Sequence, residues 1–207
     1  MRTFYDRFLI IRLTSLLRKC LFGKDINEYS IEYWKQFWTT YLEENKVFLF
    51  QTLDGHEPTG EVLGYFDNTL YEFLNDFYSK GYFKDTAIIL FSDHGQHLNG
   101  PFYLLDSEDF NIERVLPTLF LILPNNNILY KDDKYEKIKS NQQIFITAFD
   151  IYNTLIHIVY GENNEKLEGK LISYGDSLLN ELDYKNRYCN SSKIANLVSK
   201  CMCLNKK

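Results

Sequence analysis

Near the middle of this 207-residue chain, residues 86–95 read Thr86-Ala87-Ile88-Ile89-Leu90-Phe91-Ser92-Asp93-His94-Gly95. The first six residues form a continuous run without polar alternation. Such a run predicts a strand buried on both faces, as in a parallel sheet between helix layers. Asp93 and His94 follow this strand directly, and Gly95 allows the backbone to turn sharply. The segment therefore predicts a polar loop at the carboxyl end of a central strand.

The neighbouring segments extend this pattern in both directions. Residues 46–50 predict a short buried strand, and residues 63–79 have the apolar spacing of a helix that ends before Gly81. Strand, helix and strand in succession predict a right-handed crossover unit. A further buried strand is expected over 115–123. Together these segments predict a three-layer α/β/α fold around a mostly parallel sheet.

Helices are expected on either side of this core. Residues 4–19 have helical apolar spacing, and residues 30–44 carry an aromatic stripe at helical spacing, interpreted as core. The stripe consists of Tyr33, Trp34, Phe37, Trp38 and Tyr41. Residues 125–143 are rich in Asn and Lys and are expected to be exposed. A last helix is predicted from the capping residue Thr147 to Gly161.

Composition and charge indicate which classes of protein the chain can belong to. Apolar residues make up 45% and charged residues 25% of the chain, so it can form one sizeable core without a second domain. The net charge is -5 and no Lys/Arg stripe is present, which argues against binding nucleic acid. No apolar run approaches the roughly 20 residues that span a bilayer. Arg7, Arg12 and Arg18 interrupt the apolar N-terminal stretch, which is therefore a poor match to a secretory signal.

Three of the four histidines lie in or beside loops that follow predicted strands. In parallel sheets, ligands bind beyond the carboxyl ends of the strands. Asp93 and His94 offer a carboxylate and an imidazole from one tight loop, which suits a divalent ion such as zinc or manganese. The alternative interpretation is a turn in which Asp93 accepts hydrogen bonds from backbone amides. His56, in a loop with little apolar cover, is the second candidate ligand.

The other two histidines carry less information. His97 is either a ligand or substrate contact or an ordinary loop side chain, and the second interpretation is favoured. His157 lies within the apolar helix 148–160 and is interpreted as structural. No nucleophile elbow, glycine-rich phosphate loop or Cys–His pair is present, so no nucleophile can be named.

The cysteines are concentrated at the C-terminal end. Cys20 stands alone, whereas Cys189, Cys201 and Cys203 fall within the last twenty residues. A metal site would need a fourth ligand, and no histidine lies near, so a disulfide is favoured over a metal site. A disulfide would indicate an oxidising compartment. The sequon that begins at Asn190 points the same way.

The stretch 85–95 is similar to the metal-loop segment of the alkaline phosphatase–sulfatase superfamily. Most of the chain resembles one group within it, the DUF229 family. The resemblance rests on an ordered series of segments: Tyr33–Tyr41, His56 followed by Asp67, Glu113–Pro117, Thr147–Leu155, Gly175–Leu178, and Arg187 with Cys189, Cys201 and Cys203. It implies an alkaline-phosphatase-like fold of which residues 1–207 are the C-terminal portion. Within that portion, residues 1–45 would be a helical lead-in, 46–160 the sheet and metal loops, and 161–207 a Cys-containing tail.

The resemblance also implies roles for individual residues. Asp93 and His94 would ligate a metal that activates a nucleophile, and His56 would bind a second metal or contact the substrate. The nucleophile, a Thr, Ser or modified Cys in the superfamily, would precede the His56 segment and is expected to lie outside this chain. The segment 96–101 is shifted by a residue from the family pattern and lacks an expected arginine after it.

Two functional hypotheses follow. In the first, the chain is part of a hydrolase acting on a small phosphate or sulfate ester or a glycan-like substrate, complete only in a longer parent and inactive alone. In the second, it is a non-catalytic descendant that binds a metal or a partner through the same loops. The cysteine tail, the sequon and the resemblance predict an extracellular or secretory-lumen location.

Overall fold

The computed structural model describes residues 20–56, 61–96, 112, 114–124, 133–161 and 174–188. The chain divides into two compact units. One comprises Met1–Tyr82 with Gln96–Leu105, and the other comprises Phe83–Gly95 with Asp106–Lys207. A short 3-10 helix, η1 (Tyr82–Lys84), lies at the boundary between them. Within the described ranges, no helix combines the length and the apolar character needed to cross a membrane.

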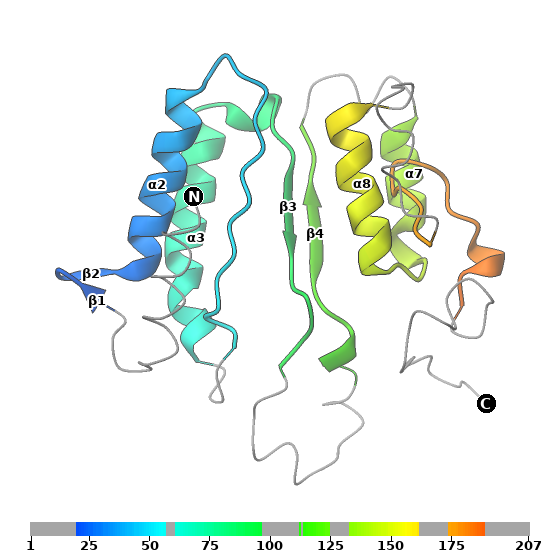
Figure 1. Ribbon diagram of the computed structural model, residues 1–207, viewed down its shortest axis with the longest axis horizontal. Helices are drawn as coiled ribbons and strands as arrows, with labels where there is room; N and C mark the ends of the chain where they lie inside the picture. The colour runs from blue at the N-terminus through cyan, green and yellow to red at the C-terminus, as the bar shows by residue number, and fades with distance from the viewer. Residues whose placement is uncertain are drawn as a thin grey trace, which may run out of the picture. The chain divides into compact units, whose positions relative to one another are not determined.

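The first unit is built on two helices that pack against each other, α2 (Ile26–Thr40) and α3 (Val62–Ser79), preceded by the short antiparallel pair β1 (Cys20–Leu21) and β2 (Lys24–Asp25) (Figure 1). The sequence predicts α2 from residue 30, but the helix begins four residues earlier. Asp25 accepts a hydrogen bond from the Asn27 amide at 2.8 Å, and Glu28 accepts one from the Asp25 amide at 3.4 Å. This capping box satisfies amides of the first turn and sets the start of the helix.

Aromatic rings fill the core of this unit. The Trp34 ring lies 4.2 Å from Phe73 and 5.4 Å from Phe48, measured between centroids, and Phe73 is 1% exposed. The predicted aromatic stripe of α2 is therefore core at Trp34. It is wrong at Tyr33 and Tyr41, which are 58% and 48% exposed. Those two positions lie at the edges of the stripe, where a tyrosine hydroxyl can stay in water.

The strand predicted over residues 46–50 does not form in the structure. These residues are extended but have no strand partner among the described residues. Phe48 and Phe50 turn toward Trp34, whereas Val47 and Leu49 are 70% and 76% exposed. Among the described residues, the segment therefore packs only its Phe48 and Phe50 face against neighbouring rings, and these two side chains are half-buried. The sequence predicted a buried strand here.

The second unit contains two paired strands, β3 (Ile88–Phe91) and β4 (Leu119–Ile122) (Figure 1). They pair antiparallel, with Ile88 opposite Ile122 and Phe91 opposite Leu119. Among the described residues, the predicted parallel sheet and crossover unit are therefore not observed, and the alkaline-phosphatase-like fold is not confirmed. The burial prediction is also only partly met, because Leu90 and Phe91 are 39% and 44% exposed. Apolar runs indicate burial, but they carry no information on strand direction.

Helices complete this unit. They are α7 (Lys134–Ser140), the short 3-10 helix η2 (Asn141–Gln143), α8 (Ala148–Tyr160) and the 3-10 helix η4 (Tyr184–Asn186). The predicted helix up to Gly161 is confirmed as α8, and Gly161 ends it at a positive φ of 76°. The exposure predicted over 125–143 is confirmed for most of its described part, residues 133–143. Lys134 and Asn141 are the exceptions and are buried, Asn141 through its hydrogen bonds to residues 178, 180 and 182. The predicted helix 4–19 lies outside the described residues.

Candidate metal loop and a buried ion-pair cluster

The loop 92–95 continues directly from β3 and is held by the chain that leads into β4. The Ser92 amide donates to the Thr118 carbonyl at 3.0 Å, one pair beyond the strand register. Three residues on, the Gly95 amide donates to the Arg114 carbonyl at 3.0 Å. The Ser92 hydroxyl also donates to the His94 carbonyl at 2.5 Å. Backbone pairing therefore fixes the loop on both sides of Asp93 and His94.

Asp93 and His94 present their side chains together from this loop. Asp93 Oδ2 lies 3.6 Å from His94 Nε2, and the two side chains are 79% and 44% exposed. His94 Nδ1 lies 2.8 Å from the Gly95 carbonyl oxygen. A carbonyl oxygen only accepts, so Nδ1 carries the proton and the lone pair of the neutral ring is on Nε2. A metal-binding histidine is commonly oriented in this way.

The pair fits two ligands of one divalent ion. Zinc binds histidine nitrogen and carboxylate oxygen at about 2.0–2.2 Å, and tetrahedral geometry then separates two donor atoms by roughly 3.4 Å. The observed 3.6 Å between Asp93 Oδ2 and His94 Nε2 is close to this value. The alternative interpretation also finds support, because Asp93 Oδ1 accepts a hydrogen bond from the His94 amide at 3.0 Å. One carboxylate can serve both roles through its two oxygens.

A complete ligand set is not assembled within the described residues. They contain no group of three or more His, Cys, Asp or Glu side chains that could hold a metal. His56 belongs to the first unit, where its amide donates to the Leu53 carbonyl at 2.9 Å in an exposed turn. Its role as a ligand stays a prediction. His97 and the cysteines Cys189, Cys201 and Cys203 lie outside the described residues.

The structural role predicted for His157 agrees with its position. The residue is 5% exposed on α8, and its Nδ1 lies 2.9 Å from the Ser177 hydroxyl oxygen. This contact belongs to a larger polar network between α8 and residues 174–188, which we call the strap. Sequence analysis did not predict the network.

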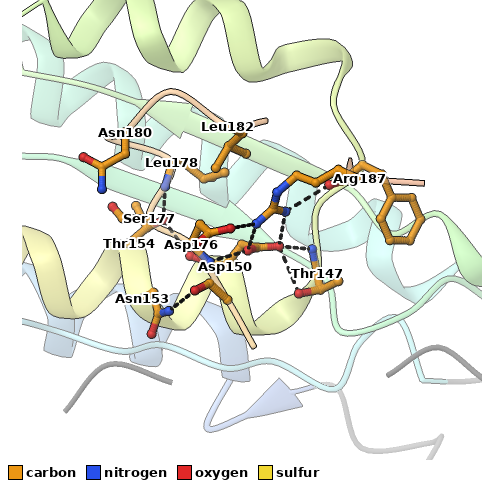
Figure 2. Close-up of polar contacts among 12 residues, drawn as sticks. Thr147, Asp150, Asn153, Thr154, Asp176, Ser177, Leu178, Asn180, Leu182 and Arg187 are labelled. Carbon is orange, nitrogen blue, oxygen red and sulfur yellow. Dashed lines mark hydrogen bonds and ion pairs between the residues drawn. The ribbon is translucent and has the colours of Figure 1, made fainter. Parts of the chain in front are cut away.

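Its centre is a cluster of Arg187, Asp150 and Asp176, which we call the clasp (Figure 2). Arg187 donates from Nη1 and Nη2 to the two carboxylate oxygens of Asp150, at 3.0 and 2.8 Å. Nη2 also donates to Asp176. The Arg187 and Asp150 side chains are only 3% and 1% exposed, whereas Asp176 is 41% exposed. The Arg187–Asp150 pair is thus a buried, bidentate ion pair.

The Asp150 carboxylate is saturated with donors. Besides Arg187, it accepts hydrogen bonds from the Thr147 amide at 2.6 Å, the Thr147 hydroxyl at 3.0 Å and the Asp176 amide at 2.7 Å. Burial lowers the pKa of Arg187, but its hydrogen bonds to the two carboxylates outweigh this effect and hold the pKa above its ordinary value. A buried charge with all its partners in place is tolerated, whereas the loss of one partner is costly.

Further hydrogen bonds run along the strap (Figure 2). Asn153 donates to the Gly175 carbonyl at 2.7 Å, and the Leu178 amide donates to the Thr154 hydroxyl at 2.8 Å. Asn141, in η2, donates to the Leu178 and Asn180 carbonyls and accepts from the Leu182 amide. Leu178, Leu179 and Leu182 are each below 5% exposed. Polar side chains thus replace a strand partner for a segment that has no regular secondary structure between 175 and 183.

The sequence contains signals for parts of this network, but they do not identify the long-range partners. Asp150 lies three residues after Thr147, the spacing of a capping box, yet its main partner is 37 residues away. Arg187 lies within residues 161–207, which were predicted as a tail, and that position gives no indication that its side chain is buried. Only the presence of Arg187 in the family-like segments pointed to a role for it.

Gly175 provides a test of how closely the strap approaches α8. A Cβ at this position would lie 2.4 Å from the Phe149 carbonyl oxygen and 3.0 Å from Asn153 Nδ2. We expect Gly175→Ala to lower the free energy of unfolding by about 1–3 kcal/mol, because the helix backbone cannot move aside. Urea denaturation followed by circular dichroism measures the change. Gly64→Ala is the control, because a Cβ there has no neighbour within 4 Å. At this helical position the substitution should raise the free energy of unfolding by about 0.5–1 kcal/mol. Equal effects of the two substitutions would contradict the close approach.

The comparisons with known proteins bear on the ancestry of these features. No curated protein and no solved structure matches the chain. A family model described as "Protein of unknown function (DUF229)" matches residues 4–207, a range that includes the loop 92–95, the clasp and the strap. The resemblance stated from the sequence is thereby confirmed at the level of the family. The chain belongs to the DUF229 family.

Proposed function

We propose that the loop 92–95 binds a divalent metal, zinc or manganese, as part of a hydrolase site for phosphate or sulfate esters. One observation carries the proposal: the Asp93 carboxylate and the His94 Nε2 atom lie 3.6 Å apart at the end of β3, both accessible to solvent. Membership of the DUF229 family and the resemblance of residues 85–95 to superfamily metal loops support it. His56 is proposed as a ligand of a second ion or as a substrate contact.

Each residue of the loop would have its own role in metal binding. Asp93 would bring negative charge to the ion, and His94 would bind through Nε2 while Gly95 holds its ring by the Nδ1 hydrogen bond. When bound, a divalent metal stabilises charge on the ester oxygens and lowers the pKa of a coordinated nucleophile. Substrate would be a small phosphate or sulfate ester or a glycan-like ester. His97 is a candidate substrate contact.

A second candidate function is metal or partner binding without catalysis. Its support is the sequence, in which no nucleophile elbow, glycine-rich phosphate loop or Cys–His pair is recognised. The two functions differ in their need for a nucleophile. The test is hydrolysis of an aryl phosphate and an aryl sulfate by protein expressed from the gene with any in-frame sequence upstream of Met1. Metal-dependent turnover supports the hydrolase, whereas metal binding without turnover in that protein supports the binding function.

Metal binding itself is tested on the 207-residue chain. We expect zinc titrated into the metal-free protein to bind at about one ion per chain, because the loop supplies two donors at ligand spacing and water or other residues complete the shell. Isothermal titration calorimetry and elemental analysis after dialysis measure the stoichiometry. A stoichiometry near zero would contradict both candidate functions in their metal-binding form.

A location outside the cell or in the secretory lumen completes the proposal. Its support is the sequon at Asn190 and the three cysteines that follow the strap in sequence, for which a disulfide is proposed. Mass spectrometry of secreted protein that finds free thiols at Cys189, Cys201 and Cys203 would contradict it.

A further inference from the structure

The hairpin of β1 and β2 presents an apolar turn to solvent beside the start of α2 (Figure 1). Leu21 pairs with Lys24, which leaves Phe22 and Gly23 as a two-residue turn with φ angles of 50° and 83°. Both angles lie in the left-handed region, as a type I′ turn requires. Glycine adopts this conformation freely, whereas a bulky residue is strained in it. The Phe22 side chain is 91% exposed, so burial of its ring does not offset the strain.

Several contacts hold this hairpin on the helix although its turn is exposed. The Tyr29 hydroxyl donates to the Leu21 carbonyl at 3.0 Å. Lys24 Nζ lies 2.6 Å from Glu32 Oε1 and 5.6 Å from the centre of the Tyr29 ring. The capping box of Asp25 joins the second strand directly to α2. The structure thus keeps a strained residue in a fixed and exposed position, an arrangement that is common at functional sites.

The exposed end of the hairpin is apolar and contains no acidic residue. Leu21 is 44% exposed and adjoins Phe22, and we call these two residues the tip. The acidic side chains nearby are engaged at the helix end of the hairpin. Asp25 and Glu28 form the capping box, and Glu32 pairs with Lys24. A partner that contacts the tip therefore meets apolar groups first.

Positive charge is concentrated in the sequence that leads into the tip. Residues 1–24 contain six Lys and Arg and one Asp, a net charge of +5, whereas the whole chain carries -5, so residues 25–207 carry -10. Arg18 and Lys19 directly precede Cys20, and two residues of chain span at most roughly 7 Å. Two cations are thus joined to the base of an apolar tip. Anionic lipid headgroups attract Lys and Arg, and the acyl boundary beneath them accepts apolar side chains.

We propose that the hairpin is a membrane-contacting site, in which Leu21 and Phe22 insert into an anionic lipid surface and Arg18 and Lys19 attract its headgroups. Both parts are needed, because a small apolar group alone binds a bilayer only weakly and reversibly. The site lies in the first unit, whereas the candidate metal loop belongs to the second. The inference therefore does not depend on the proposed hydrolase function.

Flotation of the 207-residue chain with lipid vesicles tests the proposal. We expect binding to phosphatidylcholine vesicles that contain phosphatidylserine, and weaker binding to vesicles of phosphatidylcholine alone. Phe22→Asn should weaken binding by about tenfold or more, because burial of a phenylalanine ring contributes at least the free energy of a tenfold change. Arg18→Gln combined with Lys19→Gln should weaken it by roughly fivefold for each charge removed.

The choice of asparagine separates membrane contact from folding. Asparagine is favoured at positive φ in a type I′ turn, so the unfolding temperature of Phe22→Asn should be unchanged or higher. Two control variants match the tests in chemistry but not in place. Tyr71→Gln removes a ring that is 65% exposed on α3, and Lys139→Gln removes a charge from an exposed position on α7. Both controls should bind vesicles as the wild type does.

Three results would overturn the inference. The first is vesicle affinity of Phe22→Asn that equals wild type or falls no further than that of Tyr71→Gln. The second is a lower unfolding temperature for Phe22→Asn, which would show that the ring stabilises the fold. The third is a wild-type chain that binds neither kind of vesicle, and this result leaves the proposed hydrolase function intact.

Discussion

Replacing Arg187 with alanine is expected to lower the free energy of unfolding by about 3–5 kcal/mol, the cost of breaking a buried ion pair from one side. The substitution leaves the Asp150 carboxylate, which is 1% exposed in the native chain, without its bidentate partner. It also removes the donor to the Phe145 carbonyl and to Asp176. The effect should be large because Arg187 connects the end of the strap to the first turn of α8.

Matched variants distinguish the effect of leaving a buried charge unpaired from the effect of removing side-chain volume. Asp176→Ala should cost less than Arg187→Ala, because Asp176 is 41% exposed and water can replace part of its interaction. Removing both charges, as in Arg187→Met with Asp150→Leu, should cost less than the sum of the single changes. Lys24→Ala breaks an exposed 2.6 Å pair with Glu32 and should cost much less than Arg187→Ala, because water screens an exposed ion pair.

The measurement should report on the second unit. Both tryptophans lie in α2, so their fluorescence follows the first unit only. Hydrogen exchange of peptides from α8 and the strap gives a local reading, and urea denaturation followed by circular dichroism gives the total change. Faster exchange in both α8 and the strap is expected for Arg187→Ala. If Arg187→Ala lowers the free energy of unfolding by less than about 1 kcal/mol and leaves hydrogen exchange unchanged, the clasp does not stabilise the contact between the strap and α8.

The parts of the fold that the sequence predicted well are those determined by local signals. The apolar spacing over 63–79 predicts α3 almost to the residue, because one face of a helix must meet the core. Thr147 and Gly161 bracket α8 because capping and the positive φ of its last turn are requirements of the adjacent residues. Such features depend on only a few neighbouring positions.

Features that depend on distant partners were mispredicted or missed. The run 88–91 indicates a strand, but its antiparallel pairing with β4 depends on the path of the chain between them, which periodicity does not report. Residues 46–50 have the same apolar character, yet among the described residues only Phe48 and Phe50 pack against neighbouring rings. The clasp joins Asp150 to Arg187 across 37 residues, and no local pattern marks a pair of charges as buried.

For the candidate site, the sequence placed Asp93 and His94 side by side because they are adjacent in the chain. The structure adds what adjacency does not give, namely the 3.6 Å separation of the donor atoms and the Gly95 carbonyl that holds Nδ1. Arg114 was missed as a neighbour of this loop because its contact with Gly95 follows from the antiparallel return of the chain. A parallel sheet, as predicted, would not have placed it there.

Replacing both Asp93 and His94 with alanine is expected to abolish zinc binding by the chain. Loss of an outer-sphere partner alone weakens metal affinity by about 10–100-fold, so loss of both proposed ligands should exceed that range and fall below detection by calorimetry. Both side chains are exposed, at 79% and 44%, and unfolding stability should change by less than about 0.5 kcal/mol. The variant therefore tests the site without testing the fold.

Single substitutions distinguish a ligand from a turn residue. Asp93→Asn can still accept the hydrogen bond from the His94 amide, so a purely structural Asp93 would tolerate it with zinc binding intact. If Asp93 is a metal ligand, the same substitution removes its negative charge, and the chain should lose most of its zinc affinity.

Ser92→Ala removes only the hydroxyl that donates to the His94 carbonyl and should weaken zinc binding within the outer-sphere range of about 10–100-fold. His56→Ala reports on a second ion: if His56 holds one, that ion is lost while the Asp93–His94 ion remains. Zinc affinity equal to wild type in the double alanine variant would remove the loop from the site altogether.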